Sequence, residues 1–316
     1  METLYQRYRG RRSLSLKKVW FRMRLRMTGS HARNAWRNAK RILKGDFRNN
    51  TDLFVYLFGS RSITYLNQRH EKRVLRLFER YQIDIDNDIV EFPEFRCPNF
   101  FNDDYSRIGM IHGSLDILFP AAFNVILSDT EGPCELGEVR LEKQDVVFDC
   151  GANLGLFSAV AAGRGCTVYA FEPVSKTVPY LRKTGALYPE RIHIVQTALS
   201  NTCGKARITD NFLVSTIMPE RQTTDDSMAE VDVITMDEYV HRNQIRKVDF
   251  IKADIEGAER LMLEGAKETL RVFSPKLSIC SYHFPDDPKV LENLIKQANP
   301  KYRIIHKYSK LYAYVP

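Results

Sequence analysis

The chain has 316 residues, which is enough for one large domain or for a domain of about 150 to 200 residues with attached segments. With 44% hydrophobic and 27% charged residues, its composition is typical of a globular protein, and its net charge is +8. No apolar run approaches the roughly 18 residues of a membrane-spanning helix, and the N-terminus lacks the apolar core and cleavage site of a secretory signal. The six cysteines form no C-x-x-C pair, so we expect reduced, mostly buried thiols in a cytoplasmic protein, with a membrane-peripheral location as the alternative.

The positive charge is concentrated at one end of the chain. Residues 1–48 carry a balance of +13, which leaves −5 for the remainder. Basic side chains alternate there with apolar ones such as Trp20 and Trp36, so residues 1–50 are interpreted as a basic amphipathic, helical extension. It either binds an anionic membrane surface, an acidic carrier or a peptide, or packs on the main domain as a solvated helix. Nucleic acid is disfavoured as a partner because no recognisable binding module accompanies the charge.

Residues 51–137 follow as a helical lead-in and a small cap. The runs "DLFVYLFGSRSITYL" and "HEKRVLRLFERYQI" predict helices, whereas "DNDIVEFPEFRC" and "FNVILSDTEGPCELGEVRL" predict short strands with turns. We expect this segment to cover the active site and to shape the pocket for the substrate.

The third segment, residues 138–316, has a regular α/β pattern. From Asp145, β-branched and aromatic runs alternate with helical segments such as "ERLMLEGAKETLRVF"; the runs are "DVVFD", "CTVYAFE", "RIHIVQTA", "KVDFIKAD" and "PKLSICSY". Strands and helices of these lengths predict a parallel sheet that is covered by helices on both faces. The final run "YRIIHKYSKLYAYVP" predicts two strands about a short turn, which would form an antiparallel pair at the edge of the sheet.

A glycine-containing turn follows the first strand of this domain, in "VVFDCGANLGLFSAV". Ligands of open parallel sheets bind beyond the carboxyl ends of the strands, where the strand order reverses. Gly151 and Gly155 permit positive φ angles and a close approach of a ligand to the backbone, and the amides that open the next helix favour an anionic group. The turn is therefore a candidate cofactor loop.

Two cofactor classes use such a loop. A dinucleotide site would read Gly-x-Gly-x-x-Gly, whereas Asn153 occupies the place of the second glycine, which disfavours an NAD-dependent dehydrogenase. Glu172 follows the second strand, where its carboxylate can accept hydrogen bonds from ribose hydroxyls. Asp149 can organise the loop and the ammonium end of a methionine moiety. Together these residues favour S-adenosylmethionine.

The same residues carry a resemblance to a known family. The ordered motifs "FDCGANLGLFS", "VYAFEP", "TALS", "VITMDEY", "DFIKADIEGAE" and "YHFPDD", between about Glu138 and Pro316, resemble the FkbM family of methyltransferases. This resemblance implies a Rossmann-like, seven-stranded methyltransferase sandwich that uses S-adenosylmethionine, with hydroxyl groups of sugars or natural products as the main acceptors. By position it implies the following cofactor contacts: Asp149, Gly151, Asn153 and Gly155 at the methionine end, Glu172 at the ribose with Phe171 and Pro173 beside it, and Ala198 and Leu199 flanking the adenine.

An alcohol acceptor must also lose its proton, and a general base can contribute about 100- to 10,000-fold to that step. Asp254 ends the fourth strand and His283 follows the fifth, so both face the predicted site. We expect His283 to be the base and Asp254 to position the acceptor or to orient the imidazole; the alternative for His283 is a purely structural role. Glu256 is interpreted as a cap of the next helix and Glu259 as structural.

A magnesium ion is a further hypothesis for this region. Asp254, His283, Asp286 and Asp287 could gather around one hard cation, although "FPDDP" also predicts a turn that opens a helix. The function predicted from the sequence is S-adenosylmethionine-dependent O-methylation of a hydroxyl on a glycan or secondary metabolite. The alternatives are N-methylation of a peptide or protein side chain, and a catalytically inactive module that binds membranes or acidic partners.

Overall fold

The computed structural model describes residues 74–113, 132–209, 215–218 and 228–316. The predictions for residues 1–73, which include the basic extension and the first predicted helix, lie outside the described residues. The described segments belong to one compact unit, Asn67–Pro316. Within them no helix is long and apolar enough to cross a membrane. All six cysteines are free thiols and five of them are buried, as expected.

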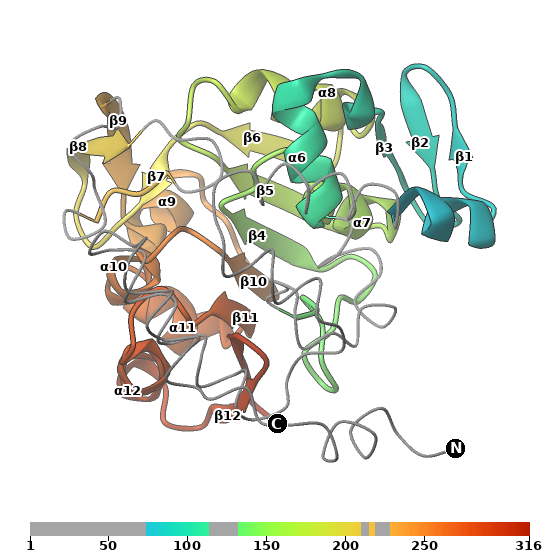
Figure 1. The fold of residues 1–316 in the computed structure, drawn as a ribbon. Helices are drawn as coiled ribbons and strands as arrows, with labels where there is room; N and C mark the ends of the chain where they lie inside the picture. The colour runs from blue at the N-terminus through green and yellow to red at the C-terminus, as the bar shows by residue number, and fades with distance from the viewer. Residues whose placement is uncertain (1–73, 114–131, 210–214, 219–227) are drawn as a thin grey trace, which may run out of the picture. The chain divides into compact units, whose positions relative to one another are not determined.

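A seven-stranded sheet forms the centre of this unit (Figure 1). Its strand order is β12-β13-β11-β10-β4-β5-β6. The strands are β4 (Val146–Cys150), β5 (Thr167–Phe171), β6 (Ile192–Val195), β10 (Phe250–Ala253), β11 (Lys276–Cys280), β12 (Arg303–Lys307) and β13 (Lys310–Tyr314). Strands β4, β5, β6, β10 and β11 are parallel, and β13 pairs antiparallel with both β11 and β12. The predicted seven-stranded fold and its antiparallel edge pair are therefore confirmed.

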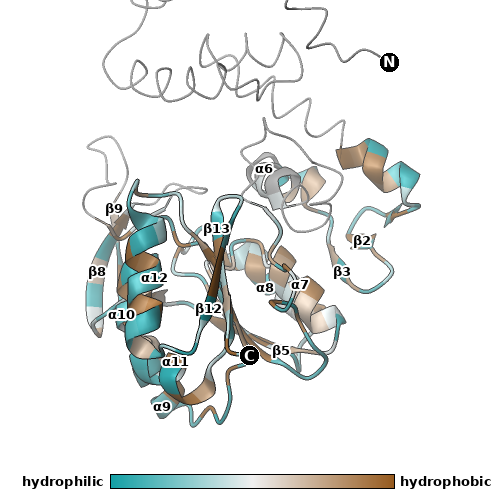
Figure 2. Ribbon diagram, turned by 90° about the horizontal axis from the view of Figure 1, so that it is seen from below, coloured by the Kyte–Doolittle hydropathy of each residue, from teal (hydrophilic) through white to brown (hydrophobic). Residues whose placement is uncertain are grey.

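Helices cover both faces of the sheet because neighbouring strand residues point to opposite sides. Val147 faces α7 (Leu156–Gly163) and α8 (Val178–Ala186), whereas Phe148 faces the apolar side chains of the other helices. These are α9 (Met236–Arg242), α10 (Glu259–Glu264), α11 (Lys267–Phe273) and α12 (Asp287–Ala298). Figure 2 shows α7 and α8 on one side of the strands and α9 to α12 on the other. On α12, Leu291 and Ile295 are four residues apart and turn one apolar stripe to the sheet.

A second, small sheet lies between β6 and α9 in the chain, and the sequence pattern did not predict it. It has the order β7-β9-β8, with β7 (Ala198–Leu199), β8 (Gly204–Thr209) and β9 (Met228–Ile234). Its strands β8 and β9 are antiparallel, and β7 and β9 are parallel. Its apolar side chains form a separate cluster that includes Val174, just after β5.

The described part of the predicted cap packs on α7. It comprises a helix over residues 74–80, the antiparallel strands β1 (Asp84–Ile85), β2 (Ile89–Glu91) and β3 (Arg96–Pro98), a 3-10 turn over Phe100–Asn102, and α6 (Asp104–Gly113). Their apolar side chains share one cluster with Leu154 and Leu156. The Tyr188 hydroxyl, after α8, donates to the Arg96 carbonyl (2.9 Å) and accepts from the Arg96 amide (2.6 Å). The predicted helix is confirmed over its described residues 74–80, and the short strands with turns predicted for "DNDIVEFPEFRC" are confirmed. The described part of "FNVILSDTEGPCELGEVRL" forms only an isolated bridge between Leu136 and Val139, so the strands predicted there are not found in residues 132–141.

We expect Gly163→Ala to loosen this packing. A Cβ at Gly163 would overlap the backbone carbonyl oxygen of Glu94, and backbone cannot yield as a side-chain end can. Overpacking of this kind costs about 1–3 kcal/mol. Thermal unfolding should show the loss, and hydrogen exchange should rise in residues 84–98. Gly185→Ala in α8 is the control, because the Cβ there meets only side-chain atoms, those of Ile194 and Ile192. An equal effect of the two substitutions would contradict the explanation.

Candidate active site

The loop after β4 lies at the carboxyl ends of the central strands, where the strand order reverses between β4 and β10. Gly151, Asn153 and Gly155 have positive φ angles of 78°, 50° and 82°. The amides of Gly151 and Ala152 both donate to the Phe171 carbonyl at the end of β5, each at 3.0 Å. The left-handed turn predicted for the cofactor loop is therefore confirmed.

Gly151 is required by its neighbours as well as by its backbone angle. A Cβ at this position would overlap the backbone carbonyl oxygen of Asp254, which follows β10. The Asp254 amide in turn donates to the Cys150 carbonyl (3.1 Å). The loop and the end of β10 are consequently in direct contact.

Asp149, near the end of β4, is buried beneath the loop and contacts α7 and β10. Its side chain has no exposed surface, and its Oδ2 accepts a hydrogen bond from the Ser158 hydroxyl of α7 (2.6 Å). Its Oδ1 lies 3.2 Å from the Lys252 Nζ, and that ammonium group also donates to the Gly151 carbonyl (2.8 Å). The expected role of Asp149 in organising the loop agrees with these contacts. Its expected role at a ligand ammonium group stays a prediction.

The sequence analysis assigned no role to Lys252. Burial lowers the pKa of this lysine, but the negative charges of Asp149 and Asp254 outweigh burial and raise the pKa above its usual value. Lys252 is therefore a buried ammonium group that neutralises Asp149. The available signal was the alternation in "FIKAD", which puts Lys252 and Asp254 on the same face of the strand.

Glu172 follows β5 directly, as predicted, and connects this strand to the loop. Its Oε2 accepts from the Asn153 amide and its Oε1 from the Val174 amide, both at 2.9 Å. Burial raises the pKa of Glu172 to about 7, against the opposing effect of these two hydrogen bonds. A carboxylate has about four lone-pair sites, so two further hydroxyl donors can still be accepted. The buried Oδ1 of Asn153 accepts no hydrogen bond from the described residues.

The remaining predicted cofactor residues differ in exposure. The Phe171 side chain is buried against Phe148 and Tyr239, so this residue contributes to the loop through its carbonyl and not through its ring. Ala198 and Leu199 are buried in β7, whereas Pro173 is partly buried. Contacts of Pro173, Ala198 and Leu199 with a nucleoside stay a prediction.

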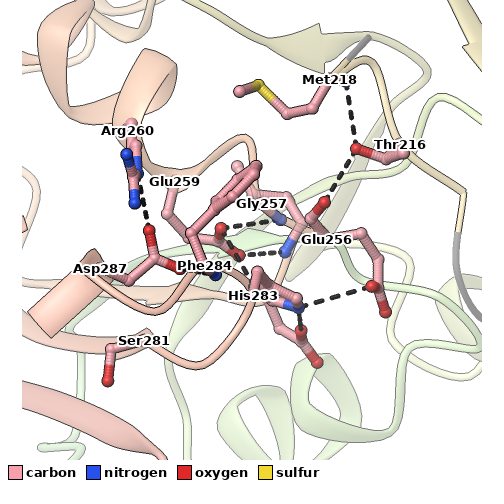
Figure 3. Close-up of polar contacts among 12 residues, drawn as sticks. Thr216, Met218, Glu256, Gly257, Glu259, Arg260, Ser281, His283, Phe284 and Asp287 are labelled. Carbon is pink, nitrogen blue, oxygen red and sulfur yellow. Dashed lines mark hydrogen bonds and ion pairs between the residues drawn. The ribbon is translucent and has the colours of Figure 1, made fainter. Parts of the chain in front are cut away.

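Carboxylates surround His283 at the neighbouring strand ends (Figure 3). The His283 Nε2 lies 3.4 Å from the Glu256 Oε2 and 3.9 Å from the Asp254 Oδ1, and the Nδ1 lies 3.3 Å from the Glu259 Oε2. Glu259 also accepts from the amides of Ile255 (2.8 Å) and Gly257 (2.9 Å), which confirms its structural role. The strand ends thus bring together His283 and Asp254, as the sequence analysis expected.

The surroundings of His283 bear on its expected role as the base. Its side chain has no exposed surface. Burial alone would lower the pKa of His283, but the hydrogen bonds and charges of Glu256 and Glu259 raise it from 6.5 to about 10. A raised pKa favours the protonated imidazole, which is less suited to accept a proton from a substrate. The role of His283 as the base stays a prediction.

Glu256 also differs from its expected role. Helix α10 begins at Glu259, and the Glu256 side chain points to His283 instead of capping the helix. Its backbone is left-handed, with φ 56°, and its carbonyl accepts from the Thr216 hydroxyl (2.8 Å). The spacing in "ADIEGAE" was the available signal for a cluster of three carboxylates.

The magnesium hypothesis does not fit these residues. Asp286 and Asp287 both pair with Arg260, each at 2.6 Å, so they are not part of the cluster. Ligand atoms of Asp254, Glu256 and His283 do lie within 4.8 Å of one another. However, histidine binds a metal only when it is deprotonated, and magnesium prefers oxygen ligands.

We expect Lys252→Met to destabilise the chain by about 3–5 kcal/mol, because it leaves Asp149 buried without its cation. Chemical denaturation of this variant, of Asp149→Leu and of the double variant should show strong coupling between the two positions. Lys247→Met is the matched control, since Lys247 forms an exposed pair with Asp249 that is worth about 0–1 kcal/mol. Equal losses from the two lysine substitutions would show that the buried pair has no special weight.

The charge on His283 predicts a pH dependence of stability. The folded chain holds a proton that the unfolded chain releases near pH 6.5, so the stabilisation is complete below pH 6.5 and is lost as the pH rises through 10. We therefore expect the free energy of unfolding, measured relative to His283→Gln, to fall between pH 6.5 and 10. Urea titrations of both proteins across this range measure the difference. A difference that does not change with pH would contradict the assignment of His283 as a cation.

Known methyltransferases are similar in sequence to the part of the chain that carries this site. Residues 149–304 match the family described as the methyltransferase FkbM domain. Hexuronic acid methyltransferase AglP of Haloferax volcanii is 27% identical over 157 residues, which are 50% of this chain and 64% of that protein. The 31-O-demethyl-FK506 methyltransferase FkbM of Streptomyces tacrolimicus is 27% identical over 162 residues, with 41% of this chain and 62% of that protein covered. The chain thus spans less than two thirds of either relative.

Among solved structures, methyltransferase FkbM from Methylobacillus flagellatus is 24% identical, with a TM-score of 0.45 and coverage of 67% of this chain and 55% of that one. Residues 149–304, just under half of the chain, therefore carry the methyltransferase FkbM domain.

Proposed function

We propose that this chain is an S-adenosylmethionine-dependent methyltransferase that acts on a hydroxyl oxygen of a glycan or a small secondary metabolite. The observation that carries the proposal is the left-handed loop after β4, tied to Glu172 and placed at the reversal of strand order in a domain of the FkbM family. The names of the two relatives describe methylation of a hexuronic acid and of a demethylated natural product, which supports both acceptor classes.

The residues of the loop fit S-adenosylmethionine. Glu172 has lone pairs left for two ribose hydroxyls. The buried Oδ1 of Asn153 is an acceptor suited to the ammonium group of the methionine end. The amides that open α7 suit the methionine carboxylate. When bound, this cofactor supplies a methyl group on a positively charged sulfur.

The chain itself supplies positioning and a proton acceptor. Methyl transfer requires the acceptor oxygen, the methyl carbon and the sulfur to lie in line, and such positioning accounts for much of the rate. Asp254 and Glu256 are candidates for the base beside His283, because they keep 28% and 17% of their side chains exposed at the strand ends. Binding of an anionic partner by residues 1–48 and a cytoplasmic location stay predictions.

Calorimetric titration with S-adenosylmethionine and with NAD tests the cofactor. We expect the chain to bind S-adenosylmethionine, and Glu172→Ala to weaken that binding by about 10- to 100-fold, because hydrogen bonds to a charged group are lost. Glu264→Gln is the matched control: this exposed carboxylate on α10 contacts Asn201 and lies outside the loop. Binding of NAD alone would favour a dehydrogenase, and binding of neither would favour an inactive binding module.

A further inference from the structure

The turn after β10, which carries Asp254 and Glu256, has an unfavourable backbone conformation. Glu256 has a φ angle of 56° and Gly257 one of 99°, so two successive residues are left-handed. A left-handed residue with a Cβ is costly and persists only when its surroundings enforce it. Contacts from other segments must therefore hold this turn.

Glu259, the first residue of α10, binds two amides of the turn. Its Oε1 accepts from the Ile255 amide (2.8 Å) and its Oε2 from the Gly257 amide (2.9 Å). The same carboxylate lies 3.3 Å from the Nδ1 of His283. These contacts hold the amide groups of the turn, but they do not involve the carbonyl of Glu256.

The hydroxyl of Thr216 binds that carbonyl. Thr216 belongs to the described segment 215–218 between β8 and β9, and its hydroxyl donates to the Glu256 carbonyl oxygen (2.8 Å). The same hydroxyl oxygen accepts from the Met218 amide (3.1 Å), so it is donor and acceptor at once (Figure 3). Hydrogen bonds that follow one another in this way polarise and strengthen each other.

Thr216 is itself fixed to the small sheet. Its amide donates to the Thr209 hydroxyl (2.9 Å) and its carbonyl accepts from the Thr209 amide (3.1 Å), at the end of β8. Thr216 is buried, with 2% of its surface exposed. Because β8 pairs with β9 along its whole length, the Thr216 hydroxyl is held by a regular element of the fold.

The conformation of this turn sets the positions of two carboxylates at His283. The Glu256 Oε2 lies 3.4 Å from the His283 Nε2, and the Asp254 Oδ1 lies 3.9 Å from the same atom. A change of Glu256 from a left-handed to a right-handed backbone would turn its Cβ, and with it the carboxylate, to another direction. The hydrogen bond from Thr216 to the Glu256 carbonyl opposes that change.

We propose that Thr216 is a positioning residue for methyl transfer: its hydroxyl keeps the left-handed turn at Glu256 and thereby keeps the Glu256 carboxylate beside His283. This inference rests on the proposed function, because Asp254, Glu256 and His283 are the candidate groups for receiving the proton of the acceptor hydroxyl. It gives the small sheet a part in catalysis, through the turn after β10. The role is the same for acidic and for neutral acceptors.

The first readout is the titration of His283, which needs no substrate. Burial lowers the pKa of His283, and the hydrogen bonds and charges of Glu256 and Glu259 raise it to about 10. We expect Thr216→Val, which removes the hydroxyl, to lower this pKa by about one pH unit or more, because the Glu256 carboxylate moves away. Thr216→Ala should give the same fall, whereas Thr216→Ser keeps the hydroxyl and should keep the parent value. NMR titration of the imidazole nitrogens measures the pKa, with His283→Gln to assign the signal.

The second readout is methyl transfer to a methyl hexuronide and to a neutral methyl hexoside, with isotope-labelled S-adenosylmethionine and mass-spectrometric detection. We expect Thr216→Val to lower kcat/KM by about 10- to 100-fold, since a displacement of about 1 Å near the reacting groups can cost that much. Thr216→Ser should restore the rate, and the affinity for S-adenosylmethionine should stay the same. Thr269→Val on α11 is the matched control, because it also loses a buried hydroxyl, here bonded to the Asp237 Oδ1 (2.7 Å), but lies outside this turn.

An unchanged pKa of His283 in Thr216→Val, an equal fall in Thr269→Val, or an unchanged kcat/KM in Thr216→Val would each overturn the inference. Failure of the parent chain to bind the methyl donor, or to methylate either sugar, would instead overturn the proposed function. The two cases are distinguishable because the titration of His283 requires neither donor nor acceptor and still decides whether Thr216 holds the turn.

Discussion

The candidate site depends on the close contact between the loop after β4 and the end of β10. At Gly151 the two backbones are too close for any side chain, and Lys252 draws them together by pairing with Asp149 and with the Gly151 carbonyl. Because β4 and β10 are parallel neighbours, their carboxyl ends meet at the same edge of the sheet. This contact brings the proposed cofactor loop and the candidate base Asp254 side by side.

The charged side chains at this edge form two layers. The lower layer is the pair Asp149 and Lys252, and the upper layer is His283 with the carboxylates around it. In the lower layer the Asp149–Lys252 pair is enclosed and close to neutral, so it fixes geometry without adding charge to the site. In the upper layer the carboxylates of Asp254, Glu256 and Glu259 lie within 3.9 Å of the ring nitrogens of His283. The lower layer suits a cofactor that needs a defined backbone, and the upper layer suits an acceptor that donates hydrogen bonds. Separate layers let the two substrates be recognised by different groups.

The fold and the cofactor loop could be predicted because their signals are local. The apolar runs of the parallel strands end at turn residues. A left-handed turn is indicated within five positions by Gly151, Asn153 and Gly155. The partner of Asp149 could not be predicted in this way. A lysine inside a strand is usually placed at the surface, and only the register between β4 and β10 sets Lys252 opposite Asp149.

The surroundings of His283 could not be predicted for a related reason. Its protonation state depends on Glu256 and Glu259, which come from a different strand–helix unit, so no pattern around the histidine contains that information. The small sheet escaped prediction because β7 has only two residues and acquires its strand character from pairing with β9. Long-range contacts decided each of these cases.

A cluster of three carboxylates is costly, and Arg260 offsets part of that cost by fixing the segments that carry it. Its guanidinium pairs with Asp286 and with the buried Asp287, and it lies over the Phe284 ring at 4.6 Å. Arg260 belongs to α10, next to Glu259, whereas Phe284 follows His283 directly. The aspartates that the sequence suggested as metal ligands therefore join the two segments that enclose His283. Since both segments are held, His283 has little freedom to move away from Glu259 and Glu256. The ion pairs of Arg260 with Asp286 and Asp287 thus help to hold His283 beside its carboxylates, and no substrate needs to touch them.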